Sequence, residues 1–189
     1  MPRVTVEVIV GTMFSGKSDE LTRRLGCLQY ANKTHMAFKP ATDTRSGDSH
    51  IVTHDGRHHP AVFVAHPHDI LQELEKRGPV DVVGIDEMQF LDPSLIQVVQ
   101  ELVRRGVSVI AAGLDMDYRG LPFRTSADMM AIADSVSKIR SAYCSCGERA
   151  IMSQRLVDGL PAPADGPTVE IGGKETYQAR CRKCHVVPE

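Results

Sequence analysis

Two glycines, a lysine and a serine near the start of the chain have the types and the spacing of a phosphate-binding loop. Gly11, Gly16, Lys17 and Ser18 fit the pattern G-x-x-x-x-G-K-[ST] and follow a β-branched apolar run, residues 4–10. Glycine permits backbone angles that turn successive N–H groups toward one point, and a following helix adds partial positive charge there. The loop is therefore expected to bind a polyphosphate, with Lys17 on its β- and γ-phosphates and Ser18 on Mg²⁺.

A pair of adjacent acids ends a second apolar run. Asp86 and Glu87 follow the segment that begins at Val80, and a phosphate loop needs an acid from a neighbouring strand to orient its metal. Consecutive side chains of a strand point to opposite faces, so the two acids are expected to have different roles. We assign Asp86 to the Mg²⁺ shell and Glu87 to the acceptor hydroxyl. The alternative is that one of the two is a solvated or helix-capping acid.

Four of the five cysteines lie near the C-terminal end and form two close pairs. Cys181 and Cys184 make a C-x-x-C pair, whereas one residue separates Cys144 from Cys146. Two such pairs resemble a zinc ribbon, in which two turns supply four ligands. The sequence therefore predicts a structural Zn²⁺ site, with free thiols or a disulfide as the alternatives and His185 as a substitute ligand.

Alternating strands and helices are predicted to position these residues. The apolar pattern predicts strands over residues 4–10, 35–39, 80–86 and 107–115, and helices after the phosphate loop, over 69–77 and over 94–106. This order predicts an α/β fold with a mainly parallel, doubly wound sheet that binds ligands at the carboxyl ends of its strands. The composition changes after Ile139, so we expect a nucleotide-binding domain over residues 1–141 and a small domain over residues 142–189.

Three other features are expected to be structural. Cys27 is predicted to be a small buried side chain on the first helix. Arg23 and Arg24 are predicted to face solvent there, with an interface in an oligomer as the alternative. The six histidines between His50 and His68 are irregularly spaced in a polar segment. A flexible, solvated loop is expected in that segment rather than a metal site.

The charge balance argues against two classes of partner. Lys and Arg number 22 and Asp and Glu number 24, a formal net charge of −2, so neither nucleic acid nor a membrane is an expected partner. No stretch approaches the roughly 18 apolar residues that span a bilayer, and we expect a soluble, intracellular protein. Three classes stay open: a small-molecule kinase, a nucleic-acid-stimulated ATPase, and a non-catalytic nucleotide-sensing or zinc-ribbon adaptor.

Seven separated stretches of the chain point to one family. They are MFSGKS, DTR, THD, GIDEMQF, GLDMDYRGLPF, QRLVDG and GGKETYQARCRKC. In these stretches the chain resembles the type II thymidine kinases, cytosolic deoxynucleoside kinases with a RecA-like P-loop domain and a small zinc-bearing lasso domain. The resemblance implies transfer of the γ-phosphate of ATP to the 5′-hydroxyl of thymidine, with Mg²⁺ and structural Zn²⁺. It also implies a cytoplasmic homotetramer and feedback inhibition by dTTP.

The resemblance also implies roles for individual residues. Glu87 matches the general base, Lys17 completes the catalytic set, and Asp55 matches an acid close to the metal and the sugar. The implied ATP and Mg²⁺ site comprises Gly11, Thr12, Met13, Phe14, Ser15, Gly16, Lys17, Ser18, Asp86 and Asp55. The implied thymidine site comprises Met13, Phe14, Asp55, Phe90, Leu114, Tyr118, Phe123, Ser153, Gly172, Gly173 and Tyr177. The implied Zn²⁺ ligands are Cys144, Cys146, Cys181 and Cys184.

Two positions depart from the family pattern. Where the family has C-x-x-C-G, Tyr143 falls at the first ligand and Cys144 lies one residue late. Tyr118 stands where phenylalanine is common, and its added hydroxyl needs a hydrogen-bond partner. Neither departure falls in the phosphate loop or in the acid pair.

Overall fold

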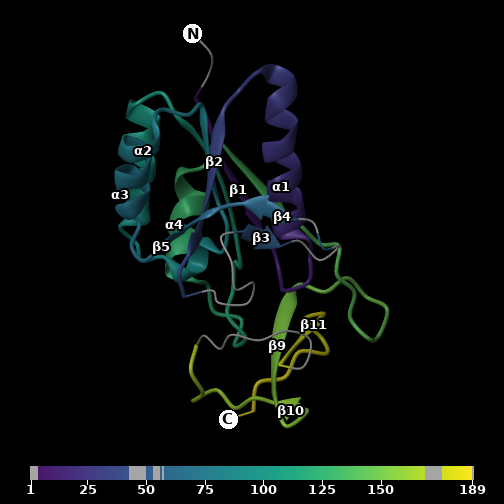
Figure 1. Ribbon diagram of the computed structural model, residues 1–189. Helices are drawn as coiled ribbons and strands as arrows, with labels where there is room; N and C mark the ends of the chain where they lie inside the picture. The colour runs from purple at the N-terminus through teal and green to yellow at the C-terminus, as the bar shows by residue number, and fades with distance from the viewer. Residues whose placement is uncertain (1–3, 43–49, 53–55, 57, 169–175, 189) are drawn as a thin grey trace.

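The centre of the molecule is a six-stranded sheet in which every neighbouring pair of strands is parallel (Figure 1). The computed structural model describes residues 4–42, 50–52, 56, 58–168 and 176–188. The strand order is β5-β2-β6-β7-β1-β8. These strands are β1 (Val6–Val10), β2 (His35–Pro40), β5 (Val62–Val64), β6 (Val82–Ile85), β7 (Ser108–Gly113) and β8 (Ser135–Lys138). The predicted mainly parallel α/β fold is confirmed.

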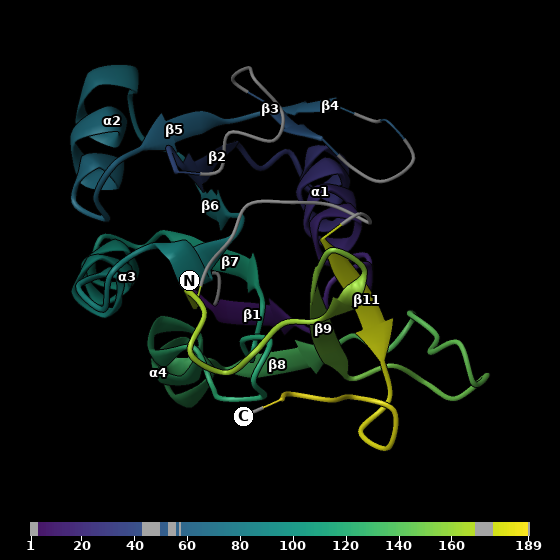
Figure 2. The ribbon, with the colours of Figure 1, turned by 90° about the horizontal axis from the view of Figure 1, so that it is seen from below.

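Helices cover both faces of this sheet (Figures 1 and 2). One face carries α2 (Asp69–Arg77), α3 (Leu95–Arg104) and α4 (Arg124–Ile132). The other face carries α1 (Lys17–Cys27), which continues into the 3₁₀ turn η1 (Leu28–Ala31). Within the described ranges, no helix has both the length and the apolar character that a membrane crossing requires.

Successive strand residues enter two separate cores, as the two-residue period of a strand requires. Val8 and Val10 of β1 pack in the core on the α2, α3 and α4 side, whereas Ile9 packs with Leu25 of α1. A Cβ at Gly84 of β6 would lie 2.6 Å from Leu25 Cδ1. The glycine in this central strand therefore lets α1 pack close to the sheet.

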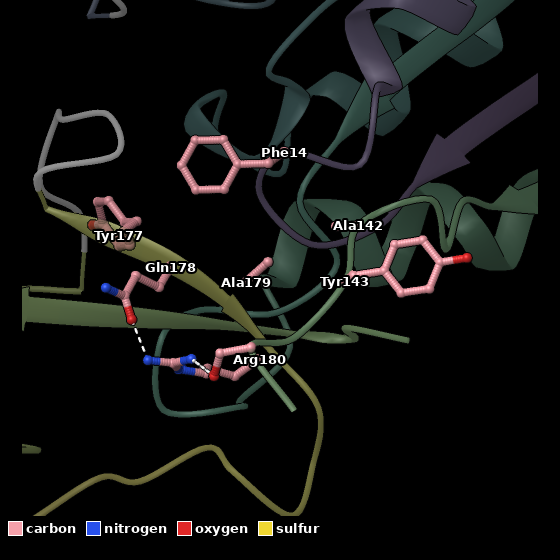
Figure 3. Close-up of a pocket in the computed structure, with 8 residues that line it drawn as sticks. Phe14, Ala142, Tyr143, Tyr177, Gln178, Ala179 and Arg180 are labelled. Carbon is pink, nitrogen blue, oxygen red and sulfur yellow. Dashed lines mark hydrogen bonds between the residues drawn. The ribbon is translucent and has the colours of Figure 1, made fainter. Parts of the chain in front are cut away.

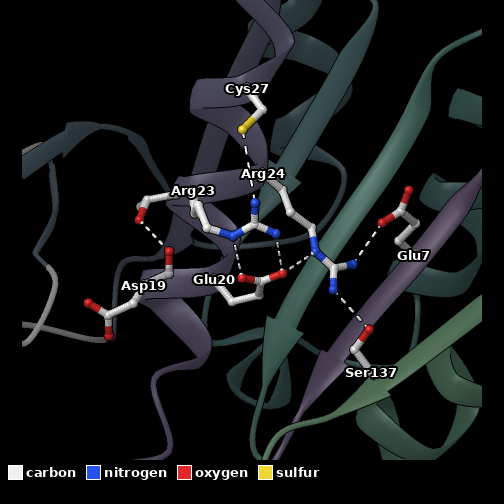
Figure 4. A network of polar contacts seen from close by, with 8 residues as sticks. Glu7, Asp19, Glu20, Arg23, Arg24, Cys27 and Ser137 are labelled. Carbon is white, nitrogen blue, oxygen red and sulfur yellow. Dashed lines mark hydrogen bonds and ion pairs between the residues drawn. The ribbon is translucent and has the colours of Figure 1, made fainter.

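Arg24 joins α1 to the sheet (Figure 4). Its guanidinium pairs with Glu20 Oε1 at 2.8 Å and with Glu7 Oε2 of β1 at 2.7 Å. Its Nη2 also donates a hydrogen bond to Ser137 Oγ of β8 at 2.9 Å. The prediction that Arg24 faces solvent is therefore wrong. The side chain of Arg23 is exposed, as predicted.

A short β-hairpin lies beside α1, where a flexible loop was expected. β3 (His50–Val52) and β4 (His58–Pro60) pair antiparallel, and Ile51 is buried in the core on the α1 side. His59 Nε2 lies 3.2 Å from Nε2 of His35 on β2. The described part of this segment is thus held by strand pairing and ring contacts. Cys27 is exposed, so its predicted burial is also wrong.

A second sheet is antiparallel and has three strands in the order β10-β9-β11. Its strands are β9 (Met152–Val157), β10 (Leu160–Pro161) and β11 (Tyr177–Arg180). In Figure 1 it lies below the large sheet, on the side where α1 begins. The large sheet ends with β8 and the small sheet begins with β9, and the division of the chain near residue 141 stays a prediction.

Candidate active site

Residues 11–16 form the loop between the end of β1 and the start of α1, and Lys17 and Ser18 are the first two residues of that helix. A Cβ at Gly11 would lie 2.6 Å from the Ile139 carbonyl oxygen and 2.8 Å from Ser15 Oγ, so only glycine fits there. Gly16, which caps α1, has a left-handed backbone with φ of +82°. Ser15 Oγ is buried and has no hydrogen-bond partner in the part of the chain that the structure describes. The loop thus holds a donor that a phosphate oxygen would satisfy.

Lys17 contacts the backbone of the phosphate loop, and Ser18 contacts the acid pair. The buried Lys17 donates from Nζ to the Thr12 carbonyl oxygen at 2.8 Å. Ser18 Oγ donates to Asp86 Oδ1 at 3.1 Å. Burial, and then the charge of Glu87, raise the pKa of Asp86 to about 7, against the hydrogen bond from Ser18. A cation beside Asp86 would offset that cost, so the Ser18 and Asp86 oxygens fit a Mg²⁺ ion.

Glu87 lies in the turn that follows β6. It is not a glycine, yet its backbone is left-handed, with φ of +51° and ψ of +40°. Such backbones are uncommon outside glycine and concentrate at functional sites. Its Oε2 accepts a hydrogen bond from Gln89 Nε2. Gln89 belongs to the GIDEMQF stretch, but no role was predicted for it. Its other partner is the backbone N–H of Leu114, which follows β7 and is distant in sequence.

Four residues of the predicted thymidine site come together in one apolar cluster. Tyr118 and Tyr177 are buried there with Ala162, and Met13 and Phe14 of the phosphate loop pack against them. The Tyr118 hydroxyl donates to the Pro163 carbonyl oxygen at 2.8 Å and also lies within hydrogen-bond distance of carbonyl oxygens 164 and 166. The extra hydroxyl therefore joins the loop after β7 to the segment that follows β10.

A pocket of about 540 Å³ opens beside this cluster (Figure 3). Phe14 projects from the phosphate loop toward β11, the strand that carries Tyr177. The other lining residues come from the turn before β9 and from β11, and they are Ala142, Tyr143, Ser145, Gln178, Ala179 and Arg180. The pocket is thus bounded by the phosphate loop on one side and by the small sheet on the other.

The other predicted thymidine contacts divide into three groups. Three of them are partly exposed: Phe90 lies after β6, Leu114 directly after β7, and Phe123 at the N-terminal cap of α4. Ser153 is buried on β9, and its Oγ accepts from Met13 N–H at 3.1 Å and lies 2.8 Å from Thr12 Oγ1. Ser153 therefore contacts the phosphate loop directly. Asp55, Gly172 and Gly173 lie outside the described residues.

The four C-terminal cysteines converge on one point despite the short spacing of the first pair. All four Sγ atoms, of Cys144, Cys146, Cys181 and Cys184, lie within 4.8 Å of one another. The Cys146 and Cys181 Sγ atoms are 3.7 Å apart, close to the ~3.8 Å edge of a tetrahedron with Zn–S bonds of about 2.3 Å. All are free thiols. The cluster is compatible with a structural zinc ion.

The surroundings of the cluster also fit a cation. Hydrogen bonds from the backbone N–H groups of Cys146 and Cys181 lower the pKa of Cys144 to about 5. The neighbouring sulfur atoms raise the pKa of Cys184 to about 12, since negative charge accumulates among them. His185 lies elsewhere, with Nε2 2.7 Å from the Tyr118 carbonyl oxygen. It is not needed as a substitute ligand, because four cysteines already supply the set.

The parallel sheet and the loop between β1 and α1 define a P-loop nucleotide-binding fold. Asp86 directly follows β6, and one strand, β7, separates β6 from β1. The sequence model of the thymidine kinase family matches residues 4–185. The chain therefore belongs to the thymidine kinase family.

Two solved structures are similar to this chain at a low level. One is the genome packaging NTPase B204 from Sulfolobus turreted icosahedral virus 2 in complex with ATP-gammaS, at 15% identity and a TM-score of 0.45, covering 75% of this chain and 77% of that chain. The other is a RuvB variant from Thermotoga maritima, at 12% identity and a TM-score of 0.44, covering 76% of this chain and 40% of that chain.

Proposed function

We propose that the protein transfers the γ-phosphate of ATP to the 5′-hydroxyl of thymidine and so forms dTMP and ADP. Membership of the thymidine kinase family supports this reaction. The observation that carries the proposal is the contact between Ser18 Oγ and Asp86 Oδ1, because it brings the phosphate loop to the acid pair. Glu87, next to Asp86, then lies at the same edge of the sheet as the phosphate loop.

In this mechanism the loop amides and Lys17 hold the phosphates of ATP. Lys17 exchanges its Thr12 carbonyl partner for phosphate oxygens. Ser18 and Asp86 would hold Mg²⁺, which would neutralise charge on the β- and γ-phosphates when bound. Glu87 accepts the proton as the 5′-oxygen bonds to the γ-phosphorus and the bond to ADP breaks. Asp55, outside the described residues, is proposed to assist near the metal and the sugar.

The nucleoside is proposed to bind between the phosphate loop and the small sheet. Met13, Phe14, Tyr118 and Tyr177 supply apolar walls there, and such walls suit a flat pyrimidine base. Phe90, Leu114, Phe123, Ser153, Gly172 and Gly173 are proposed to complete this site. Exclusion of water from it would prevent transfer of the phosphoryl group to water.

The remaining expectations are also proposals. The four-cysteine cluster is proposed to hold Zn²⁺ as a structural ion that organises the small domain, residues 142–189. A homotetramer is proposed as the assembly, and dTTP as a feedback inhibitor, with its base in the nucleoside site and its phosphates toward the loop. If dTTP did not compete with thymidine, that mode of inhibition would be excluded.

The test is a product assay with ATP, Mg²⁺ and each common deoxynucleoside. We expect selective formation of dTMP by the wild-type protein and a loss of roughly 10²-fold or more in kcat for Glu87→Gln, because the general base is removed. Glu75→Gln, at an exposed acid of α2, is the matched control and should keep wild-type kcat. ATP consumption without a phosphorylated nucleoside would exclude the kinase, and stimulation by DNA would favour the ATPase alternative.

A further inference from the structure

Gln89 connects the proposed general base to the neighbouring strand through both ends of its carboxamide. Its Oε1 accepts a hydrogen bond from the Leu114 backbone N–H at 2.9 Å, and its Nε2 donates to Glu87 Oε2. A backbone N–H can only donate, so the carboxamide oxygen must face Leu114. The NH₂ group must then face Glu87, and the orientation of the amide follows from its partners.

The surroundings hold this carboxamide in place. The Gln89 side chain is buried, with 7% of its surface exposed. A Cβ at Gly113 would lie 2.4 Å from Gln89 Oε1, so the glycine at the end of β7 leaves room for the amide. The Leu114 carbonyl oxygen accepts from Ser126 Oγ of α4 at 2.6 Å. The backbone at Leu114 is thus fixed on both sides and can serve as a rigid anchor.

We propose that Gln89 is a positioning residue that holds the Glu87 carboxylate in the orientation required to take the proton from the nucleoside hydroxyl. This inference rests on the proposed function. Glu87 has a left-handed backbone in a turn, and a donor anchored at Leu114, just after β7, limits the positions of its carboxylate. Misplacing a catalytic group by about 1 Å can cost on the order of 10² in rate, so a lost anchor should lower kcat.

Gln89→Glu is the sharpest variant. It has nearly the same shape and keeps an oxygen for the Leu114 N–H, but it replaces the donor facing Glu87 with a second carboxylate oxygen. Two carboxylates within hydrogen-bond distance of each other share a proton, so Glu87 would no longer be free to accept one from the substrate. We expect kcat for dTMP formation to fall about 10–100-fold, the acidic limb of its pH profile to move to higher pH, and the KM for ATP to stay within about twofold.

The double variant with Glu87→Gln separates positioning from structure. If Gln89 acts through Glu87, then Gln89→Glu lowers kcat in the wild-type background and has little further effect beside Glu87→Gln. A structural role would lower kcat in both backgrounds together with thermal stability. Gln97→Glu, at an exposed glutamine of α3, is the charge-matched control and should keep wild-type kcat.

The outcomes are distinguishable. Wild-type kcat and pH profile in a folded Gln89→Glu protein would overturn the positioning role alone. A wild-type protein that forms no dTMP would overturn the proposed function and this inference with it. If Gln89→Glu does not fold, Gln89→Met adds no charge and removes the same donor, and its kcat must fall for the proposal to stand.

Discussion

Gly11 of the phosphate loop and Gly26 of the following helix show how differently two glycines act. At Gly11 a Cβ would meet the Ile139 carbonyl oxygen at 2.6 Å and Ser15 Oγ at 2.8 Å. At Gly26, on α1, a Cβ would have no neighbour within 4 Å. The first position therefore demands glycine for close approach of the backbone, whereas the second has the usual entropic cost of a glycine in a helix.

We expect Gly11→Ala to weaken ATP binding at least tenfold, because the added methyl group displaces Ser15 and the loop backbone that faces the phosphates. Isothermal titration calorimetry with ATP and Mg²⁺ measures this effect. Gly26→Ala is the matched control and should raise the free energy of unfolding by about 0.5–1 kcal/mol without changing ATP affinity. Equal ATP affinity in the two variants would contradict the role given to Gly11.

At the residue scale, the sequence predicted the site residues that lie in short contiguous motifs. The phosphate loop and the acid pair are short patterns, and the structure brings Ser18 and Asp86 into contact. Two sets of hydrogen bonds could not be predicted. Gln89 bonds to Leu114, 25 residues away, and the Tyr118 hydroxyl bonds to carbonyl groups 45 or more residues away. Hydrogen bonds between distant segments leave no local pattern in a single sequence.

At the scale of elements, burial decided which strands the sequence could predict. Every residue of β6 and β7 is buried, so both strands read as apolar runs. The edge strand β8 is mostly exposed, and β3 has one buried residue of three. The sequence predicted neither strand, because neither has a continuous apolar run. Both are held as strands by pairing, β8 with β1 and β3 with β4.

The hairpin formed by β3 and β4 is attached to the sheet through two half-buried histidines. Burial lowers the pKa of His35 below its ordinary 6.5, and burial together with His35 and His50 lowers the pKa of His59. The short distance between the two Nε2 atoms requires that one be unprotonated, so that it can accept the hydrogen bond. A second neighbouring pair, His50 and His58, is in edge contact.

We therefore expect the protein to lose stability as the pH falls below about 6.5, because histidines with lowered folded pKa values bind protons more readily in the unfolded chain. The stability that the neutral pair contributes is present above the unfolded pKa and is lost below it. Urea unfolding at pH 5.5 and 7.5 measures the change. His59→Gln should reduce the difference between the two pH values, and His68→Gln, where no contact to this pair is observed, should leave it unchanged. An equal pH dependence in wild type and His59→Gln would contradict this prediction.

At the scale of the whole molecule, the phosphate loop is supported by the small sheet and by the segment that leads to it. Ser153 of β9 contacts the loop at Thr12 and Met13. Ser141 Oγ, before the first cysteine pair, donates to the Ser15 carbonyl oxygen at 2.6 Å. The second cysteine pair directly follows β11. The first cysteine pair thus follows Ser141 closely, and the second follows β11, the strand that pairs with β9. The cluster is therefore connected to both contacts with the phosphate loop.

If the four cysteines hold Zn²⁺ as proposed, its removal by a chelator is expected to weaken thymidine binding before it weakens ATP binding. The cysteine cluster lies before β9 and directly after β11. The phosphate loop is also supported by β1 and α1, for which no side-chain hydrogen bond to these four cysteines is described. We expect a higher KM for thymidine and a lower thermal midpoint while ATP still binds, and added Zn²⁺ should restore both. Cys181→Ser should reproduce the loss, and Cys27→Ser, at an exposed cysteine outside the cluster, should not. Loss of ATP binding with an intact nucleoside site would mean that the metal supports the phosphate loop rather than the small sheet.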